Sequence, residues 1–119
     1  PLVAEDTVFV VTYQGKLAAV DISTGALNWE RDISAYQNMA LDRDHLYVTD
    51  NNYDLWAIDK YTGATHWKQN ALETRYITGP CVVNDRVVVA DRGGYLHILS
   101  PDNGHLLDRY SYKGKFFQN

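Results

Sequence analysis

The sequence predicts an all-β fold, made of about three four-stranded antiparallel blades of a partial β-propeller. The first observation is a repeat in which segments 1–29, 39–67 and 80–108 align without a gap. The second is that each copy holds only strand-like patterns and turns, with no apolar spacing of 3.6 residues. The third is a shared ending, in which an apolar strand, a polar turn with glycine and a second strand follow one another. A period of about 40 residues with strands alone is typical of propeller blades.

Each copy supplies four expected strands joined by short turns, the first being the innermost of its blade. Segment 7–13 is rich in β-branched and aromatic residues, which favours a buried strand. In order, the expected strands cover 1–4, 7–13, 16–21 and 26–33; 39–41, 45–49, 54–59 and 64–69; and 81–83, 86–90, 95–99 and 105–110. The chain then divides into repeat 1 (1–38), repeat 2 (39–79), repeat 3 (80–112) and a lead-in to a next blade (113–119).

The residues shared between copies form a structural repeat motif. Its members are Asp21, Gly25, Trp29, Asp59, Gly63, Trp67 and Gly104. We expect each tryptophan to reach across the gap between blades, with its indole N–H donating to a backbone carbonyl of the adjoining blade. We expect each aspartate to accept hydrogen bonds from its own turn. In the third copy Ser100 replaces the aspartate and Asp108 replaces the tryptophan, so the outer contact of that blade should be weaker.

Three blades cannot close a ring, because propellers typically have about four to eight. The chain starts at Pro1 inside a strand and stops at 116–119, in the lead-in to another blade. We therefore expect a fragment of a larger repeat protein, with any signal peptide or anchor outside it. Open blade edges should make such a fragment self-associate.

Composition is that of an ordinary folded domain, with 45% hydrophobic residues and a net charge of −4. This mild acidity argues against a nucleic-acid surface, which needs clustered Lys and Arg. No apolar run approaches the roughly 20 residues of a membrane-spanning helix. The single cysteine, Cys81, excludes an internal disulfide and a Cys-rich metal site, and we expect it to be a small buried hydrophobe.

The pattern Ala-x-Asp-x-x-Thr-Gly-x-x-x-Trp, at 19–29 and 57–67, resembles the repeat of pyrroloquinoline-quinone-type propellers. That superfamily includes quinoprotein alcohol dehydrogenases and non-enzymatic relatives. Segments 13–21, 78–80 and 117–118 are similar to one such relative, the BamB family of outer-membrane assembly lipoproteins. The most specific stretch is Asp91-Arg92-Gly93-Gly94-Tyr95-Leu96-His97.

This resemblance implies the C-terminal part of an eight-bladed ring that acts as a non-catalytic protein-binding scaffold. The implied partners are the periplasmic domains of the barrel insertase BamA and other subunits of the outer-membrane β-barrel assembly complex. The implied location is the periplasmic face of the bacterial outer membrane, held there by an N-terminal lipid. The family's known partner contacts would lie upstream of Pro1, so no partner-binding residue is assigned in this chain.

A quinoprotein-type dehydrogenase propeller is the main alternative, and a propeller binding module with another partner is a third possibility. The dehydrogenase would need a catalytic aspartate and a calcium cage of oxygen ligands, usually with a pair of adjacent cysteines that this sequence lacks. The best oxygen-rich cluster, 50–54, occupies the hairpin position of its repeat, so a polar turn is the preferred interpretation. We therefore predict no enzyme, no cofactor, and no catalytic, cofactor-binding or metal-binding residue.

The histidines share no short metal-ligand spacing. We expect His97 to be a structural histidine on an inner strand, and His45, His66 and His105 to be exposed. Ser100, His97 and Asp102 lie too close in sequence, on alternating positions, to suggest a catalytic triad.

With no catalytic or metal site predicted, the remaining candidate function is recognition of a protein by surface residues. The tyrosines at turns and strand ends could contact a partner or merely cover the blade rims: Tyr36, Tyr53, Tyr61, Tyr76, Tyr110 and Tyr112. Loop 73–76 is an insertion relative to the first copy, and insertions often map to a binding face. Arg75→Glu is the first substitution that the sequence suggests for testing this loop.

Overall fold

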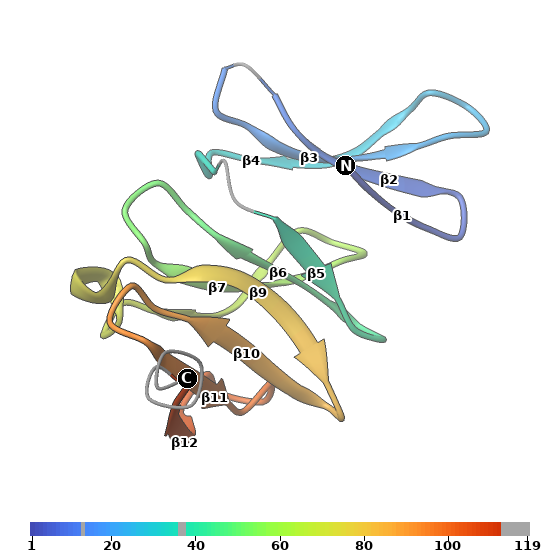
Figure 1. Ribbon diagram of the computed structural model, residues 1–119. Helices are drawn as coiled ribbons and strands as arrows, with labels where there is room; N and C mark the ends of the chain where they lie inside the picture. Colours follow the sequence, from blue (N-terminus) through green and yellow to red (C-terminus); the bar gives the residue numbers. More distant parts are fainter. Residues whose placement is uncertain (13, 36–37, 113–119) are drawn as a thin grey trace.

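The computed structural model describes residues 1–12, 14–35 and 38–112, which form three four-stranded antiparallel sheets (Figure 1). Neighbouring strands in each sheet are consecutive in the chain. The first sheet holds β1 (Leu2–Ala4), β2 (Thr7–Val11), β3 (Leu17–Asp21) and β4 (Leu27–Arg31); the second holds β5 (Met39–Leu41), β6 (His45–Thr49), β7 (Leu55–Asp59) and β8 (Thr65–Gln69); the third holds β9 (Thr78–Val83), β10 (Arg86–Ala90), β11 (Tyr95–Leu99) and β12 (Leu106–Ser111). The expected all-β class and blade topology are confirmed.

The third sheet departs from expectation at its first strand, which begins at Thr78 rather than at residue 81. A bulge explains the difference, because Val88 pairs with Cys81 but Ala90 pairs with Thr78. Pro80 has no N–H to donate and is accommodated in this irregular stretch of an edge strand. The repeat boundary proposed between 79 and 80 therefore falls inside β9.

A short 3₁₀ helix, η1 (Glu73–Arg75), lies in the loop before β9 and was not expected. In the described ranges no helix is long and apolar enough to cross a membrane. Three expectations fall on residues outside the described ranges: Tyr13 at the end of the second strand, Tyr36 as a surface tyrosine, and the lead-in at 113–119.

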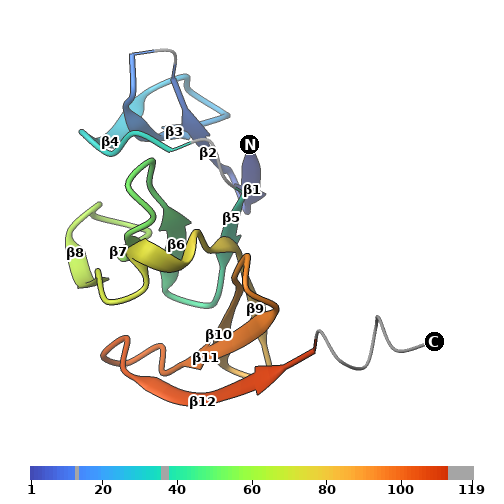
Figure 2. The same ribbon diagram turned by 60° about the vertical axis from the view of Figure 1, so that its left-hand side comes forward.

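The three sheets follow one another as successive blades (Figure 2). The first strands of the sheets, β1, β5 and β9, lie along one side of the stack, and β4 and β8 lie on the other (Figure 2). This is the arrangement in which each propeller blade offers both faces to its neighbours. The β6–β7 and β10–β11 hairpins therefore lie on the same side of the stack (Figure 1).

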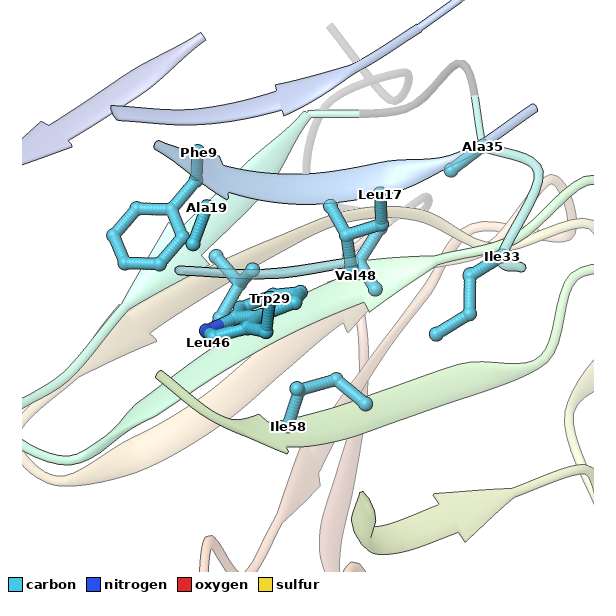
Figure 3. Close-up of a cluster of buried hydrophobic side chains, with 9 residues drawn as sticks. All are labelled: Phe9, Leu17, Ala19, Trp29, Ile33, Ala35, Leu46, Val48 and Ile58. Carbon is cyan, nitrogen blue, oxygen red and sulfur yellow. The ribbon is translucent and has the colours of Figure 1, made fainter. Parts of the chain in front are cut away.

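The hydrophobic cores lie between sheets rather than inside one of them. Strand β6 shows why: its alternate residues point to opposite faces, so Leu46 and Val48 pack toward the first sheet while Tyr47 packs toward the third. The first core consists of Phe9, Leu17, Ala19, Trp29, Ile33, Ala35, Leu46, Val48 and Ile58 (Figure 3). The second consists of Tyr47, Leu55, Ala57, Trp67, Leu72, Ile77, Val87, Val89 and Leu99.

The outermost strand of the third sheet, β12, is exposed at all six residues. Its apolar side chains Leu106, Leu107 and Tyr110 face solvent. An open edge of this kind is a template for pairing with another chain. Self-association of the isolated chain through this strand therefore stays a prediction.

Candidate partner-binding surface

Two tryptophans join the sheets through the same set of contacts. Trp29 of β4 donates its indole N–H to the carbonyl of Lys60 at 2.9 Å, and its ring lies against Gly63 in the same turn of the second sheet. Arg31, two residues further along β4, donates to the carbonyl of Gly63 at 2.6 Å. Phe9 packs against the indole from behind, with ring centroids 6.1 Å apart. One turn of the next blade therefore receives a ring and two hydrogen bonds.

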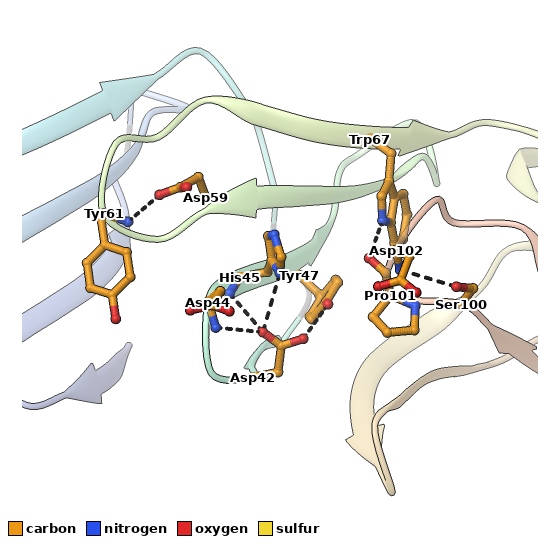
Figure 4. Close-up of polar contacts among 10 residues, drawn as sticks. All are labelled: Asp42, Asp44, His45, Tyr47, Asp59, Tyr61, Trp67, Ser100, Pro101 and Asp102. Atoms are coloured by element: carbon orange, nitrogen blue, oxygen red, sulfur yellow. Dashed lines mark hydrogen bonds and ion pairs between the residues drawn. The ribbon is translucent and has the colours of Figure 1, made fainter.

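The second and third sheets are joined in the same way (Figure 4). Trp67 donates to the carbonyl of Pro101 at 2.8 Å and lies against Gly104, while Gln69 donates to the carbonyl of Gly104 at 2.8 Å. Tyr47 takes the place of the phenylalanine, with its ring 6.0 Å from the indole. Burial, together with the hydrogen bond to Asp42, raises the pKa of the Tyr47 hydroxyl. In both copies the expected indole contact with the adjoining blade is present.

A one-residue bulge sits directly before each tryptophan. Trp29 pairs with Ala19 but Leu27 pairs with Val20, which leaves residue 28 without a partner in the ladder. The second sheet repeats this, with Trp67 opposite Ala57 and residue 66 left over between Thr65 and Trp67. A bulge bends the strand and changes the direction of the neighbouring side chain. Both alanines are fully buried. We infer that the small side chain and the bulge together leave room for the indole to turn toward the next sheet.

The polar turns between the third and fourth strands of the first and second sheets are each held by their own aspartate. The Asp59 carboxylate accepts from the N–H groups of Tyr61 and Thr62 at 2.8 and 3.0 Å, and Asp21 does the same in the first sheet. Hydrogen bonds from Ser23 and Thr24 lower the pKa of Asp21. The expected Asx-type turns are therefore present.

The third copy differs at the docking position. Asp108 stands where the other copies have tryptophan, and it pairs with Ile98 rather than with alanine. Its carboxylate accepts from the Arg109 N–H at 2.9 Å and from the Tyr110 hydroxyl at 2.7 Å. Asp108 therefore forms its hydrogen bonds within its own strand, β12. A weaker outer contact for this blade stays a prediction.

In the oxygen-rich hairpin between β6 and β7, Asp50 bonds within the hairpin, whereas Oδ1 of the buried Asp54 has no hydrogen-bond partner among the described residues. Asp50 accepts from the N–H groups of Asn52 and Asp54 and from the indole of Trp56 at 2.8 Å. Asp54 is buried, with Lys68 3.5 Å away, and hydrogen bonding to Asp54 raises the pKa of Glu73. Across the described part of the chain, no three His, Cys, Asp or Glu side chains are grouped to hold a metal ion.

The hairpin between β10 and β11 is built around Asp91, which is almost completely buried. One carboxylate oxygen accepts from the Tyr95 N–H at 3.0 Å. The other contacts His97 Nε2 at 2.7 Å and Arg75 of η1 at 3.1 Å. Arg109 Nε donates to His97 Nδ1 at 3.1 Å, so the histidine holds its proton on Nε2 and donates it to Asp91. The expected structural role of His97 is confirmed, and this network fixes η1 against the third sheet.

Acid should weaken this network through Asp91. Burial alone would raise the pKa of Asp91, but hydrogen bonds from His97, Tyr95 and Arg75 outweigh burial and lower it. A lowered folded-state pKa stabilises the fold fully above the unfolded value of about 3.9, and this stabilisation disappears as pH falls through the folded-state pKa.

We therefore expect Asp91→Asn to cost about 1–3 kcal/mol at pH 7, because it leaves buried donors without an ionised acceptor. The difference between the variant and the wild type should shrink below about pH 4. Urea unfolding at several pH values between 3 and 7 measures it. A difference that stays constant over this range would contradict the role given to Asp91.

Of the remaining histidines and the cysteine, all but His45 are exposed. His66 and His105 are exposed as expected, whereas His45 is half-buried and stacks on His66 with ring centroids 4.4 Å apart. Cys81 is exposed, so the expected burial was wrong. The apolar character of an innermost strand does not reveal which of its side chains face a core, and Cys81 lines an open hollow beside Met39 and Leu41.

Tyrosines and arginines gather at the hairpin ends of the second and third sheets. A hollow of about 380 Å³ is lined by Tyr53, Tyr76, Thr78, Ala90, Asp91, Arg92 and Tyr112. A second, of about 350 Å³, is lined by Thr74, Arg75, Tyr76, Asp91, Arg92 and Gly93. We call the residues that line these two hollows the hairpin-end surface. Tyr and Arg are the side chains that most often dominate binding at protein interfaces.

The structure places three of the expected surface tyrosines in this surface, Tyr53, Tyr76 and Tyr112. Tyr61 and Tyr110 are exposed but lie elsewhere. Sequence reasoning selected Arg75, whose guanidinium is committed to the buried Asp91, and it missed Arg92. The signal that could have pointed to the surface is Tyr53, which occupies a position held by glycine in the other two copies.

Comparison with known proteins identifies the family. The family model for outer membrane protein assembly factor BamB matches residues 1–69. The BamB of Legionella pneumophila is 40% identical over 114 residues, which cover 96% of this chain and 30% of that relative. The BamB of Alkalilimnicola ehrlichii is 43% identical over 109 residues, which cover 92% and 28%. The chain thus spans about a third or less of the length of the relatives it matches.

Solved structures give the same family and a wider fold group. The crystal structure of BamB from Moraxella catarrhalis superposes with a TM-score of 0.87 at 25% identity, covering 93% of this chain and 33% of that one. A quinohemoprotein alcohol dehydrogenase from Comamonas testosteroni superposes with a TM-score of 0.76 at 22% identity, covering 92% and 20%. The dehydrogenase shares the fold alone, whereas the family model and the sequence relatives are specific. The chain belongs to the BamB family of outer membrane protein assembly factors.

Proposed function

We propose that the protein containing this chain is a non-catalytic, protein-binding scaffold of the outer-membrane β-barrel assembly complex. It works at the periplasmic face of the bacterial outer membrane and assists the folding and insertion of outer-membrane proteins. Its partners are the periplasmic domains of BamA and other subunits of the complex. Membership of the BamB family supports this proposal, and the chain contributes three blades of the scaffold.

The observation that carries the proposal is how the polar side chains are used. Asp50, Asp91 and His97 are candidates for chemistry in the described ranges, and each is held in a hydrogen-bond network. Asp54 Oδ1, which has no hydrogen-bond partner in the described part of the chain, is buried away from solvent. A general base or a metal ligand needs a free atom directed at the substrate or the ion. What the chain offers outward is instead a surface of tyrosine and arginine, which suits recognition of a protein.

The alternative, a quinoprotein-type dehydrogenase, is favoured only by the shared fold. Fold alone does not determine activity in a superfamily that hosts both enzymes and scaffolds. We therefore treat it as the hypothesis against which the scaffold is tested.

Genetic complementation tests the proposal. In a bacterium that lacks its own BamB, the complete protein should restore the amount of folded outer-membrane protein. A variant with Trp67→Ala should restore less, because it loosens the junction between two blades. A complete protein that accumulates in the periplasm without any restoration would reject the scaffold function.

A further inference from the structure

The hairpin of the second sheet contains a residue that its backbone conformation disfavours. Gly15, Tyr53 and Gly94 occupy the same position in the three copies, and all three have positive φ angles, of 76°, 64° and 93°. Glycine adopts this conformation without steric cost, whereas a tyrosine does not. Residues held in such conformations concentrate at binding sites. The side chain of Tyr53 is therefore a candidate for a role outside the local turn.

The ring of Tyr53 meets a second tyrosine that is also in the left-handed region. Tyr76, with φ of 53°, follows η1 and packs edge-on against Tyr53, with ring centroids 5.0 Å apart. Arg92 lies over the other ring, with its guanidinium carbon 4.6 Å from the Tyr76 centroid. The Arg92 N–H also donates to the carbonyl of Arg75 at 3.2 Å, which ties the hairpin of the third sheet to η1. Three loops thus hold these three side chains next to one another.

The charges around this frame are unequal. Arg75 is paired with Asp91, whose carboxylate is also bonded to His97. Within the described ranges Arg92 forms no ion pair, although it lines both hollows. A guanidinium stacked on an aromatic ring keeps its N–H edges free to bind a carboxylate through two parallel hydrogen bonds. The hairpin-end surface therefore combines one uncompensated cation with two aromatic walls.

We propose that this surface binds an acidic segment of a protein partner. A Glu or Asp carboxylate of the segment accepts hydrogen bonds from Arg92, and a neighbouring aromatic side chain packs against Tyr53 and Tyr76. The net charge of −4 disfavours a polyanion but not a single carboxylate flanked by apolar groups. This inference rests on the proposed function, because it takes the ligand to be a protein.

The test is a nuclear magnetic resonance titration of the isotopically labelled complete protein with two capped peptides. The first is Gly-Phe-Glu-Phe-Glu-Gly, and the second has both Glu replaced by Gln. We expect the first peptide to shift the signals of Tyr76, Gly93 and the Arg92 side chain. The Gln peptide should bind about tenfold more weakly, as expected when a charge-assisted contact becomes neutral.

Variants separate binding from folding. Arg92→Glu should weaken binding of the Glu peptide by about tenfold or more. Arg86→Glu is the matched control, because Arg86 is exposed at the opposite hairpin, and it should leave the affinity unchanged. Tyr53 also packs against the second core, so Tyr53→Gly should weaken binding of the Glu peptide together with a lower urea midpoint.

Equal binding of both peptides, or an unchanged affinity in Arg92→Glu, would overturn the proposal. Unchanged affinity of Tyr53→Gly for the Glu peptide would also contradict it. Peptide binding that depends on Arg92, in a protein that does not complement a strain lacking BamB, would support this inference and reject the scaffold function. Complementation without peptide binding would support the scaffold function and reject this inference.

Discussion

Replacing Trp29 or Trp67 with alanine is expected to lower the free energy of unfolding by about 3–5 kcal/mol. Each indole is more than nine-tenths buried between two sheets, and each donates its N–H to a carbonyl of the next blade. Alanine would leave a cavity lined by the two cores, and the carbonyl would lose its donor. Urea unfolding at low protein concentration measures the change.

A graded variant separates the ring from its hydrogen bond. Trp29→Phe keeps most of the apolar area but loses the donor to Lys60, so it should cost about 1–2 kcal/mol, part from the hydrogen bond and part from the smaller ring. A loss below about half a kcal/mol for Trp29→Ala would mean that the tryptophan does not hold the blades together.

Substitution of the receiving glycine is expected to have the second large effect. A Cβ on Gly63 would lie 2.7 Å from the Trp29 ring, and one on Gly104 would lie 2.5 Å from the Trp67 ring. These are the flat faces of buried indoles, which cannot move aside without repacking a core. Alanine should therefore cost about 1–3 kcal/mol for the steric conflict, added to about 1–2 kcal/mol for its left-handed backbone conformation.

Gly25 provides the matched control for this prediction. It has nearly the same φ, 75° against 79° for Gly63, but a Cβ built on it meets nothing within 4 Å. Gly25→Ala should therefore pay the backbone cost alone, and Gly63→Ala should unfold at clearly lower urea. Equal losses for the two variants would show that contact with the tryptophan contributes nothing to the glycine requirement.

The repeat allowed most of the fold to be predicted from the sequence. Strand alternation and turn chemistry are local, so β6 and β10 have the bounds expected for them, and the Asx turns of Asp21 and Asp59 follow from their own neighbours. The contact of Trp29 with the next blade could be expected because a large aromatic residue at a fixed place in a repeat must bury itself against its neighbour.

The rest depends on contacts between segments that have no local signal. Arg75 meets Asp91 only because η1 folds back over the third sheet, and no pattern around residue 75 announces that. The bulge at Pro80 lengthens β9, and the apolar sequence of that strand does not show that Cys81 faces a hollow. Arg92 was missed for a similar reason, since a hairpin residue acquires its aromatic neighbour Tyr76 only in the folded molecule.

Asp91 also changes how the surface should be probed. Arg75→Glu would place a second carboxylate beside a buried one, so a loss of binding could reflect damage to the network with His97. Arg92 lies at the same surface without an ion pair in the described ranges. Substitution of Arg92 therefore reports on recognition more directly than substitution of Arg75.

Binding of the complete protein to the periplasmic domains of BamA, measured by calorimetry beside titrations with pyrroloquinoline quinone and calcium, tests the scaffold function most directly. The account predicts a dissociation constant of about a micromolar or tighter for the protein partner, and no heat or spectral change from the cofactor. Uptake of the quinone with calcium, in the absence of binding to BamA, would instead identify a catalytic propeller.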